Sequence, residues 1–319
     1  MTKKILIISS SGLASEKIQE LENMFKDVNI VQCKDNLESL KNNIKEINAL
    51  INCPRNIFSK EVFLEIKNTL EWVHIGGAGC EEYLFPEFVS SEVILTNGKI
   101  IQGPEVSDHA IALLLCITRN LNYILKNKTL VMPRPLELKN KKVLILGVGG
   151  IGSLIAEKLS AFGMYIIGID QKLVPMNSFI NEFYYQQDME SVINQADVVI
   201  SAVPSTSISN KIFDNNLFGK MKDGVIFINI SRGKIVDTNA LLAFLKKDKF
   251  SGVGLDVTDP EPLDSEHGLR KDIRVVISPH IAGPSDQNRN RSLEILDKNI
   301  RNYILGHPLI NIVDKKLGF

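Results

Sequence analysis

The chain has 319 residues, of which 44% are hydrophobic and 23% are charged, and 37 basic side chains balance 37 acidic ones. This length favours two domains, and the zero net charge excludes an overall field that would attract nucleic acid or an anionic membrane. The longest apolar run, at 111–117, is too short to span a bilayer, and four scattered cysteines without a C-x-x-C pair argue for a cytoplasmic protein with neither disulfides nor a metal site.

The first hundred residues alternate between strand-like and helix-like stretches. Apolar runs predict buried strands at 4–9, 49–53, 72–75 and 93–95, and helical spacing predicts helices at 16–26 and 37–47. Strands that alternate with helices imply right-handed βαβ units and a parallel sheet. The N-terminal apolar run is too short for a signal peptide, so we interpret it as the first of these strands. Because this part has no G-x-G-x-x-G motif, we expect it to serve something other than cofactor binding.

A long helix leads into a second alternating series. Pro104 and Glu105 suit the first turn of a helix that we expect to run to about 123, and its stretch 110–117 is apolar nearly all round. We therefore expect this helix to be buried between domains or subunits. Further elements follow as strands at 143–146, 165–169, 198–202, 225–230, 254–257 and 275–277, with helices at 151–162 and 289–305.

A glycine-rich turn follows the strand at 143–146. Residues 147–152 read Gly-Val-Gly-Gly-Ile-Gly, which places glycine where the turn is tight, where the backbone meets a pyrophosphate and where the helix packs on the strand. Asp170 lies about 20 residues further on, where a carboxylate can accept hydrogen bonds from both ribose hydroxyls. Its charge repels a 2′-phosphate, so the pattern predicts NAD rather than NADP.

Three chemically active side chains follow the later strands in the order Arg232, Glu261 and His280. The carboxyl ends of parallel strands meet at the edge of a sheet where ligands bind. A histidine can give and accept protons near neutral pH, a neighbouring carboxylate stabilises its charged form, and the arginine fork suits the carboxylate of a 2-oxo acid. Together they predict reversible carbonyl reduction beside a bound nicotinamide.

Several segments carry the sequence pattern of one family, at 146–152, 221–224, 228–237, 254–257, 261–263, 278–283 and 306–309. In these segments the chain resembles the D-isomer-specific 2-hydroxyacid dehydrogenases. The resemblance is dense from about residue 100 onward and looser before it. Two departures are Cys80, near a position where the family often has aspartate, and Asp108-His109, where a Glu-His pair is common. They leave the identity of the substrate open.

The resemblance implies roles for individual residues. Arg232 would orient the substrate, Glu261 would partner the histidine, and His280 would be the general acid and base. The N–H groups of Gly77, Ala78 and Gly79 would hold the substrate carboxylate. Asp256 would bind the nicotinamide carboxamide, and the cofactor as a whole would contact Gly147, Gly149, Gly150, Ile151, Gly152, Asp170, Val203, Pro204, Ile230, Ser231, Asp256, Ala282 and Gly283.

The implied fold is α/β, with two Rossmann-like, doubly wound parallel-sheet domains. Residues 1–100 and 285–319 would form a discontinuous, flavodoxin-like substrate domain, and residues 101–284 an inserted NAD-binding domain, with the active site in the cleft between them. The implied partners are a small 2-oxo or D-2-hydroxy acid and a second copy of the chain, paired through the NAD-binding domains. Two alternatives stay open: an NAD(H)-sensing, corepressor-like binding protein of the same fold, and a formate or phosphite dehydrogenase.

Overall fold

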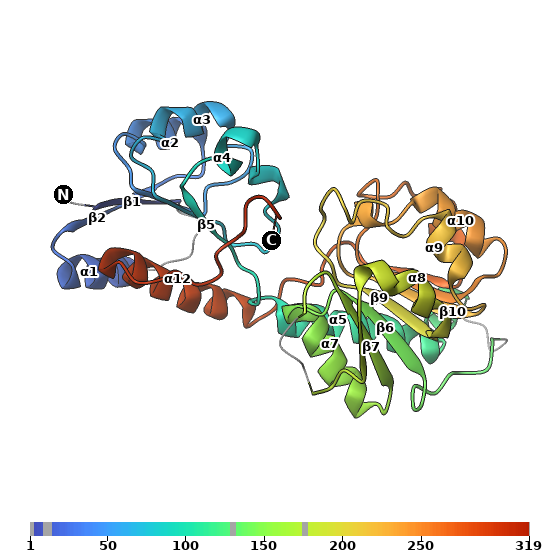
Figure 1. The fold of residues 1–319 in the computed structure, drawn as a ribbon. Helices are drawn as coiled ribbons and strands as arrows, with labels where there is room; N and C mark the ends of the chain where they lie inside the picture. The colour runs from blue at the N-terminus through green and yellow to red at the C-terminus, as the bar shows by residue number, and fades with distance from the viewer. Residues whose placement is uncertain (1–2, 9–14, 128–131, 174–177, 319) are drawn as a thin grey trace. The chain divides into compact units, whose positions relative to one another are not determined.

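Each alternating series folds around its own parallel sheet (Figure 1). The computed structural model describes residues 3–8, 15–127, 132–173 and 178–318. Unit 1 comprises Met1–Ile101 and Ser285–Phe319, and unit 2 comprises Gln102–Pro284. The chain thus leaves unit 1 after the last strand of the first sheet and returns to it for the C-terminal helix.

Unit 1 is a five-stranded parallel sheet in the order β2-β1-β3-β4-β5. This is the flavodoxin-like order, as predicted. Along β1, Ile5 and Ile7 pack toward α1 and α12, whereas Leu6 and Ile8 pack toward α2, α3 and α4. Because both faces are covered, β1 is a continuous apolar run. The elements are β1 (Lys3–Ile8), α1 (Ser15–Met24), β2 (Val28–Cys33), α2 (Leu37–Asn43), β3 (Ala49–Ile51), α3 (Lys60–Ile66), β4 (Trp72–His74), α4 (Pro86–Val89), β5 (Ile94–Thr96) and α12 (Asn288–Leu305).

The last residue of β4, His74, is a buried histidine. It is 2% exposed, and its Nδ1 lies 2.8 Å from the Thr96 hydroxyl, which also accepts a hydrogen bond from Trp72 Nε1 at 2.8 Å. Burial lowers the pKa of His74 from 6.5 to about 4, because the charged ring loses its water. The folded protein therefore holds His74 neutral at a pH where the unfolded chain already binds a proton.

Below a pH of about 6.5 the free energy of unfolding is expected to fall as the pH decreases. The unfolded state takes up a proton that the folded state accepts only near pH 4, so the loss reaches about 3 kcal/mol at that pH. Urea unfolding of the wild type and of His74→Gln across this range measures it, with exposed His307→Gln as the control. A His74→Gln protein with the same pH dependence as the wild type would contradict the assignment.

Unit 2 is a seven-stranded parallel sheet in the order β12-β11-β10-β9-β6-β7-β8, with its change of direction between β6 and β9. The predicted doubly wound sheet is confirmed, since α5 and α7 pack on one face and α8, α9, α10 and α11 on the other. The elements are α5 (Gly103–Thr118), α6 (Leu121–Asn127), β6 (Lys142–Leu146), α7 (Gly150–Ala161), β7 (Tyr165–Asp170), β8 (Glu182–Tyr185), α8 (Met189–Val192), β9 (Val198–Ser201), α9 (Asn215–Lys220), β10 (Val225–Asn229), α10 (Thr238–Leu245), β11 (Phe250–Leu255), α11 (Gly268–Lys271) and β12 (Val275–Ile277).

The long helix predicted to run to residue 123 is wrong at its C-terminal end. α5 ends at Thr118, and Asn120 has a φ of 59°, a left-handed conformation that asparagine tolerates, before α6 begins. The apolar face of α5 packs on the sheet of its own unit. Gly252 and Gly254 of β11 allow this approach, since a Cβ on Gly252 would lie 2.2 Å from Ile117 Cγ2. The expected burial between domains or subunits is therefore not needed to explain the apolar stretch.

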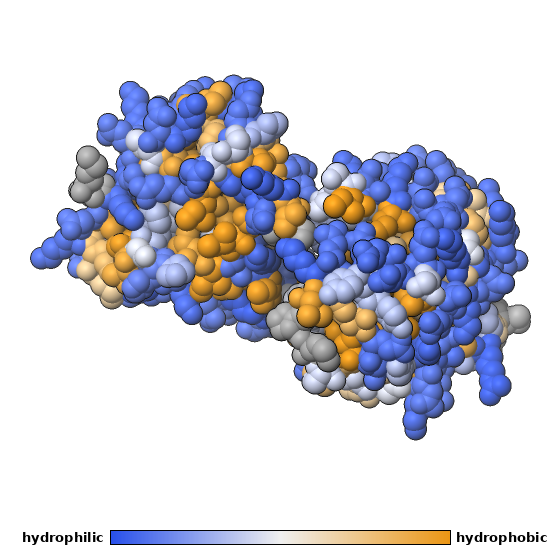
Figure 2. All heavy atoms as spheres, in the orientation of Figure 1, coloured by the Kyte–Doolittle hydropathy of each residue, from blue (hydrophilic) through white to orange (hydrophobic). Residues whose placement is uncertain are grey.

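The visible face of each unit is largely hydrophilic, with apolar side chains in scattered patches (Figure 2). In the part of the chain that the structure describes, no helix combines the length and the apolar character needed to cross a membrane. One short helix, α6, does expose apolar side chains on one side, namely Leu121, Ile124 and Leu125.

Candidate active site

The turn between β6 and α7 leaves room in front of the helix. Gly147 has a φ of 87°, and a Cβ there would lie 2.7 Å from the Ala202 carbonyl oxygen, so only glycine fits. A Cβ on Gly152 would lie 1.9 Å from the Gly147 oxygen, so the helix could not pack so closely with any other residue there. At Gly149 no described atom lies within 4 Å of an ideal Cβ. This open space lies in front of the first N–H groups of α7, at Gly150, Ile151 and Gly152, and a side chain at position 149 would fill it. The turn therefore fits a phosphate.

Asp170 ends β7 beside this turn. Its Oδ2 accepts a hydrogen bond from Val148 N at 3.0 Å and its Oδ1 accepts one from Gln171 N at 2.8 Å, which hold the carboxylate against the glycine turn. On the other side, Val203 Cγ1 lies 2.8 Å from the ideal Cβ position of Gly147, and the exposed Pro204 follows it. The predicted pyrophosphate, ribose and adenine contacts therefore lie around one turn, at the change of direction in the sheet.

Buried Asn229, at the end of β10, fixes the turn that carries Arg232. Its Oδ1 accepts a hydrogen bond from Ser231 N and its Nδ2 donates to the Arg232 carbonyl oxygen, both at 3.0 Å. The hydroxyl of Ser231 lies 2.9 Å from that of Ser201, and Arg232 Nη1 donates to the Ser231 carbonyl oxygen at 2.8 Å. Ile230 and Ser231 are buried, while the Arg232 side chain is half-buried. The Arg232 side chain thus extends from a turn whose backbone is fixed by hydrogen bonds to Asn229.

The turn of Arg232 packs directly on the turn of Glu261. A Cβ on Gly233 would lie 1.9 Å from the Thr258 carbonyl oxygen, so glycine is required for this close approach. Thr258 N donates to Glu261 Oε2 at 3.2 Å, and Thr258 Oγ1 donates to the Pro260 carbonyl oxygen at 2.9 Å. The Glu261 carboxylate is therefore anchored at one oxygen by its own loop.

Its other oxygen meets His280. The distance from Glu261 Oε1 to His280 Nδ1 is 2.6 Å, and both side chains are half-exposed. An ionised carboxylate only accepts hydrogen bonds, so His280 carries its proton on Nδ1 and Nε2 is the nitrogen that gains or loses a proton. His280 has a φ of 54°, an uncommon conformation for a residue with a side chain. The backbone therefore needs strong support from its surroundings.

Asp256 supplies that support from the end of β11. It is 2% exposed, and its carboxylate accepts hydrogen bonds from Ser278 Oγ at 2.7 Å, Ile281 N at 3.0 Å and Ala282 N at 3.1 Å. Burial raises the pKa of Asp256, but hydrogen bonds from His109, Ser278 and the two amides outweigh burial and lower the pKa to about 2. The loop that presents His280 is thus fastened to a buried, permanently ionised carboxylate.

The predicted substrate loop, Gly77, Ala78 and Gly79, lies in unit 1 after β4. The Gly77 carbonyl oxygen accepts a hydrogen bond from Gly98 N at 2.8 Å, and the Ala78 carbonyl oxygen accepts one from Asn97 Nδ2 at 2.6 Å. A Cβ on Gly98 would lie 2.3 Å from the Gly76 oxygen, so glycine is needed here as well. These contacts fix the peptide planes of the loop.

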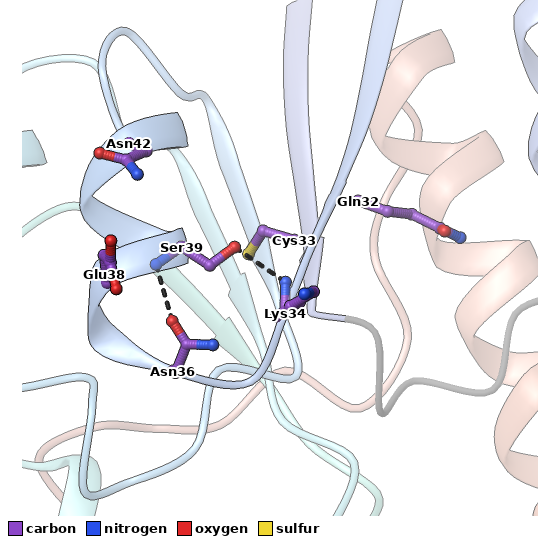
Figure 3. A pocket seen from close by; sticks show the side chains of 7 residues that line it. All are labelled: Gln32, Cys33, Lys34, Asn36, Glu38, Ser39 and Asn42. Atoms are coloured by element: carbon purple, nitrogen blue, oxygen red, sulfur yellow. Dashed lines mark hydrogen bonds between the residues drawn. The ribbon is translucent and has the colours of Figure 1, made fainter.

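A polar pocket of about 590 Å³ lies elsewhere in unit 1, beside β2 and α2 (Figure 3). Its polar groups already serve the local turn, since Ser39 Oγ accepts from Lys34 N at 3.0 Å and Asn36 Oδ1 accepts from Ser39 N at 2.8 Å. None of the predicted site residues lines it. The pocket is lined by Gln32, Cys33, Lys34, Asn36, Glu38, Ser39 and Asn42.

Among the described residues, no three histidine, cysteine or acidic side chains are grouped as metal ligands.

Three residues that shape the site are not among the predicted site residues. Asn229 and Ser278 belong to the motif segments, and His109 stands at a departure from the family pattern. His109 lies on α5, far from the site in sequence, yet its Nε2 is 2.7 Å from Ser278 Oγ. A buried polar residue at a strand end is the one local signal that could have identified Asn229.

Comparison with known proteins agrees with this geometry. The model of the D-isomer specific 2-hydroxyacid dehydrogenase NAD binding domain matches residues 111–282, which lie within unit 2. A glyoxylate reductase of Thermococcus litoralis is 30% identical over 285 residues, covering 85% of this chain and 85% of that protein. An "uncharacterized protein in proB 3'region" of Corynebacterium melassecola is 33% identical over 180 residues, which are 56% of this chain and 59% of that protein.

The whole chain also resembles a solved structure. A D-isomer specific 2-hydroxyacid dehydrogenase family protein from Aeromonas salmonicida superposes with a TM-score of 0.80 at 25% identity, covering 99% of this chain and 100% of that one. The family model spans more than half of the chain, and both parallel sheets have the family's arrangement. The chain therefore belongs to the D-isomer-specific 2-hydroxyacid dehydrogenase family, and is an oxidoreductase with an NAD-binding domain.

Proposed function

We propose that the protein interconverts a small 2-oxo acid and its D-2-hydroxy acid with NAD(H), using His280 as the general acid and base. The observation that carries the proposal is the 2.6 Å contact between His280 Nδ1 and Glu261 Oε1, with the turn of Arg232 packed against the turn of Glu261. A proton donor, a carboxylate that orients it and a cation for the substrate thus follow three neighbouring strands of the NAD-binding domain.

When bound, NADH supplies a hydride to C2 of the 2-oxo acid, and the protein supplies orientation and the proton. The Arg232 guanidinium binds the substrate carboxylate and carbonyl oxygen as a planar fork. His280 donates the proton on Nε2 to the carbonyl oxygen as negative charge develops there. Glu261 keeps the opposite ring nitrogen protonated and balances the charge of the imidazolium. In the reverse direction Nε2 accepts the hydroxyl proton.

We also propose that unit 1 is the substrate-binding domain. The support is the substrate loop, where Gly98 and Asn97 bind the carbonyl oxygens of Gly77 and Ala78 and so orient the N–H groups of Ala78 and Gly79, which follow them in the same peptide planes. Adjacent N–H groups on a glycine loop bind a carboxylate without a side chain in the way. A structure of the protein with NAD and a 2-oxo acid analogue tests this. An analogue carboxylate bound without contact to the loop would contradict it.

The proposed cofactor is NAD rather than NADP, on the strength of Asp170. Its carboxylate is held beside the turn by Val148 N and Gln171 N, where it would accept hydrogen bonds from the ribose hydroxyls and repel a 2′-phosphate. Asp170→Ala is expected to weaken NADH binding about 10–10²-fold, because hydrogen bonds to a charged group contribute about 1.5–3 kcal/mol. The same change should strengthen NADPH binding.

Fluorescence titration with both cofactors measures these changes in Kd, and Asp170→Asn separates the effect of charge from that of shape. A wild type that prefers NADPH would contradict the proposal.

We propose further that the protein is a homodimer paired through the NAD-binding domains. The support is the exposed apolar side of α6, formed by Leu121, Ile124 and Leu125, the last of which is 77% exposed. Apolar side chains grouped in this way are costly in water, and a second copy of the chain would bury them. Light scattering gives the mass directly, and a monomer at micromolar concentration would contradict the proposal.

A panel of substrates tests the main proposal. NADH oxidation is expected with at least one of glyoxylate, hydroxypyruvate, pyruvate and longer 2-oxo acids. NADH binding without turnover on any of them would instead favour the NAD(H)-sensing alternative.

A further inference from the structure

His109 lies beside the loop that carries His280, and the proposed mechanism gives it no part. It projects from α5, its side chain is 20% exposed, and its Nε2 lies 2.7 Å from Ser278 Oγ and 3.3 Å from Asp256 Oδ1. Both partners belong to the group that holds the His280 loop. The position of His109 therefore indicates that it helps to fix that loop.

The direction of these hydrogen bonds follows from counting protons. The Ser278 hydroxyl has a single proton, and it is donated to Asp256 Oδ1 at 2.7 Å. The contact between His109 and Ser278 must then be a donation from His109 Nε2 to the hydroxyl oxygen. The same N–H also points within reach of Asp256 Oδ1. His109 therefore donates from Nε2 and completes a chain that runs from His109 through Ser278 to Asp256.

This chain ends at the backbone of His280. Asp256 accepts from His280 N through its carbonyl oxygen at 2.9 Å, and from Ile281 N and Ala282 N through its carboxylate. His280 is thus held in its left-handed conformation by hydrogen bonds to the residues around it. Because the His280 amide is bound by the carbonyl oxygen of Asp256 and the next two amides by its carboxylate, the position of Asp256 determines where the His280 ring lies.

Contacts with neighbouring elements fix the position of α5, the helix that carries His109. Near its start, Lys158 of α7 donates to the Pro104 carbonyl oxygen at 2.9 Å and to Ser107 Oγ at 2.6 Å. Further along, a Cβ on Gly254 of β11 would lie 3.1 Å from Leu113 Cβ, so helix and strand are in close contact. His109 lies between these two attachments, which limits how far its ring can move.

We propose that His109 is a positioning residue, which donates its Nε2–H to Ser278 and Asp256 and so fixes the loop that presents His280 to the substrate. The inference rests on the proposed function and adds to it a residue that touches neither substrate nor cofactor. Misplacing a reacting group by about 1 Å costs about 10²-fold in rate. Loss of the His109 donor therefore lowers kcat by up to that factor.

Two variants test the proposal. His109→Leu removes the donor and keeps an apolar side chain, whereas His109→Gln keeps an N–H near the position of Nε2. We expect His109→Leu to lower kcat by about 10–10²-fold and to raise the primary deuterium isotope effect on kcat with deuterated NADH, because a misplaced proton donor slows the chemical step. His109→Gln should recover most of the lost kcat and return the isotope effect to the wild-type value.

A readout without turnover separates this inference from the proposed function. The chain has 5 histidines, so the His280 imidazole signals can be assigned by substitution in ¹⁵N spectra. Those signals should change in His109→Leu and not in His109→Gln. If the wild type turns over no 2-oxo acid, the proposed function fails while the spectra still decide the role of His109. Unchanged kcat or unchanged His280 signals in His109→Leu would overturn the inference. If that variant does not fold, Ser278→Ala removes the same bridge and is read in the same way.

Discussion

Replacing His280 with alanine is expected to lower kcat by about 10²–10⁴-fold, the usual contribution of a positioned general acid and base. The imidazole is held through Nδ1 by Glu261 at 2.6 Å, so its removal deletes the proton donor and leaves Arg232 and the glycine turn in place. The Kd for NADH should change little. Steady-state turnover at saturating NADH and 2-oxo acid, with NADH binding measured in parallel, gives both quantities.

Glu261→Gln is the matched variant for this prediction. Its amide oxygen can still accept a hydrogen bond from His280 Nδ1, but the negative charge that balances the imidazolium is gone. We expect a smaller loss of kcat than for His280→Ala, since orientation survives and charge stabilisation does not. Near wild-type turnover in His280→Ala would show that His280 is not the general acid and base. That conclusion would hold for any result with Glu261→Gln.

Replacing Arg232 with alanine is expected to lower kcat/KM by about 10²-fold, since charge-assisted hydrogen bonds contribute on the order of 3 kcal/mol. Its turn is fixed by Asn229 and by the close approach of Gly233 to Thr258, so the loss is one of substrate contact rather than of fold. Rates measured over a range of 2-oxo acid concentrations test this, with thermal unfolding to check that the variant is folded.

Two neighbouring changes show whether shape or charge matters at this position. Arg232→Lys keeps the charge but loses the planar fork, and should recover only part of the activity. Lys234→Ala removes an exposed cation from the same turn and should have no comparable effect. If Lys234→Ala lowered kcat/KM as much as Arg232→Ala, general attraction of the anion would explain the result and Arg232 would have no specific role.

The interior of both sheets was predictable from sequence, whereas one edge strand of each sheet was not. The central strands are continuous apolar runs because helices cover both faces, and the predicted ranges agree with β1, β6 and β10 to within a few residues. The two strands that the sequence analysis missed, β2 and β8, are both at sheet edges. In β2, buried Val28 and Ile30 alternate with exposed or partly exposed positions, and no buried run marks the strand.

The reacting residues of the candidate site were predictable from sequence, whereas the residues that position them were not. Strand ends in a parallel sheet share an edge, so the order of Arg232, Glu261 and His280 was enough to predict that they serve one site. The contact of His109 with Ser278 joins positions 169 residues apart and depends on how α5 packs on β11. The left-handed backbone of His280 likewise results from hydrogen bonds to Asp256, which the local sequence does not encode.

The transfer of deuterium from labelled NADH tests the central claim most directly. The protein is incubated with hydroxypyruvate or pyruvate and with NADH that carries deuterium at both positions of the reactive nicotinamide carbon, and the product is separated on a chiral column. The proposed mechanism predicts a D-2-hydroxy acid with deuterium at C2, formed by the wild type and about 10²–10⁴-fold more slowly by His280→Ala. An L product, a product without deuterium, or equal formation by the variant would contradict it.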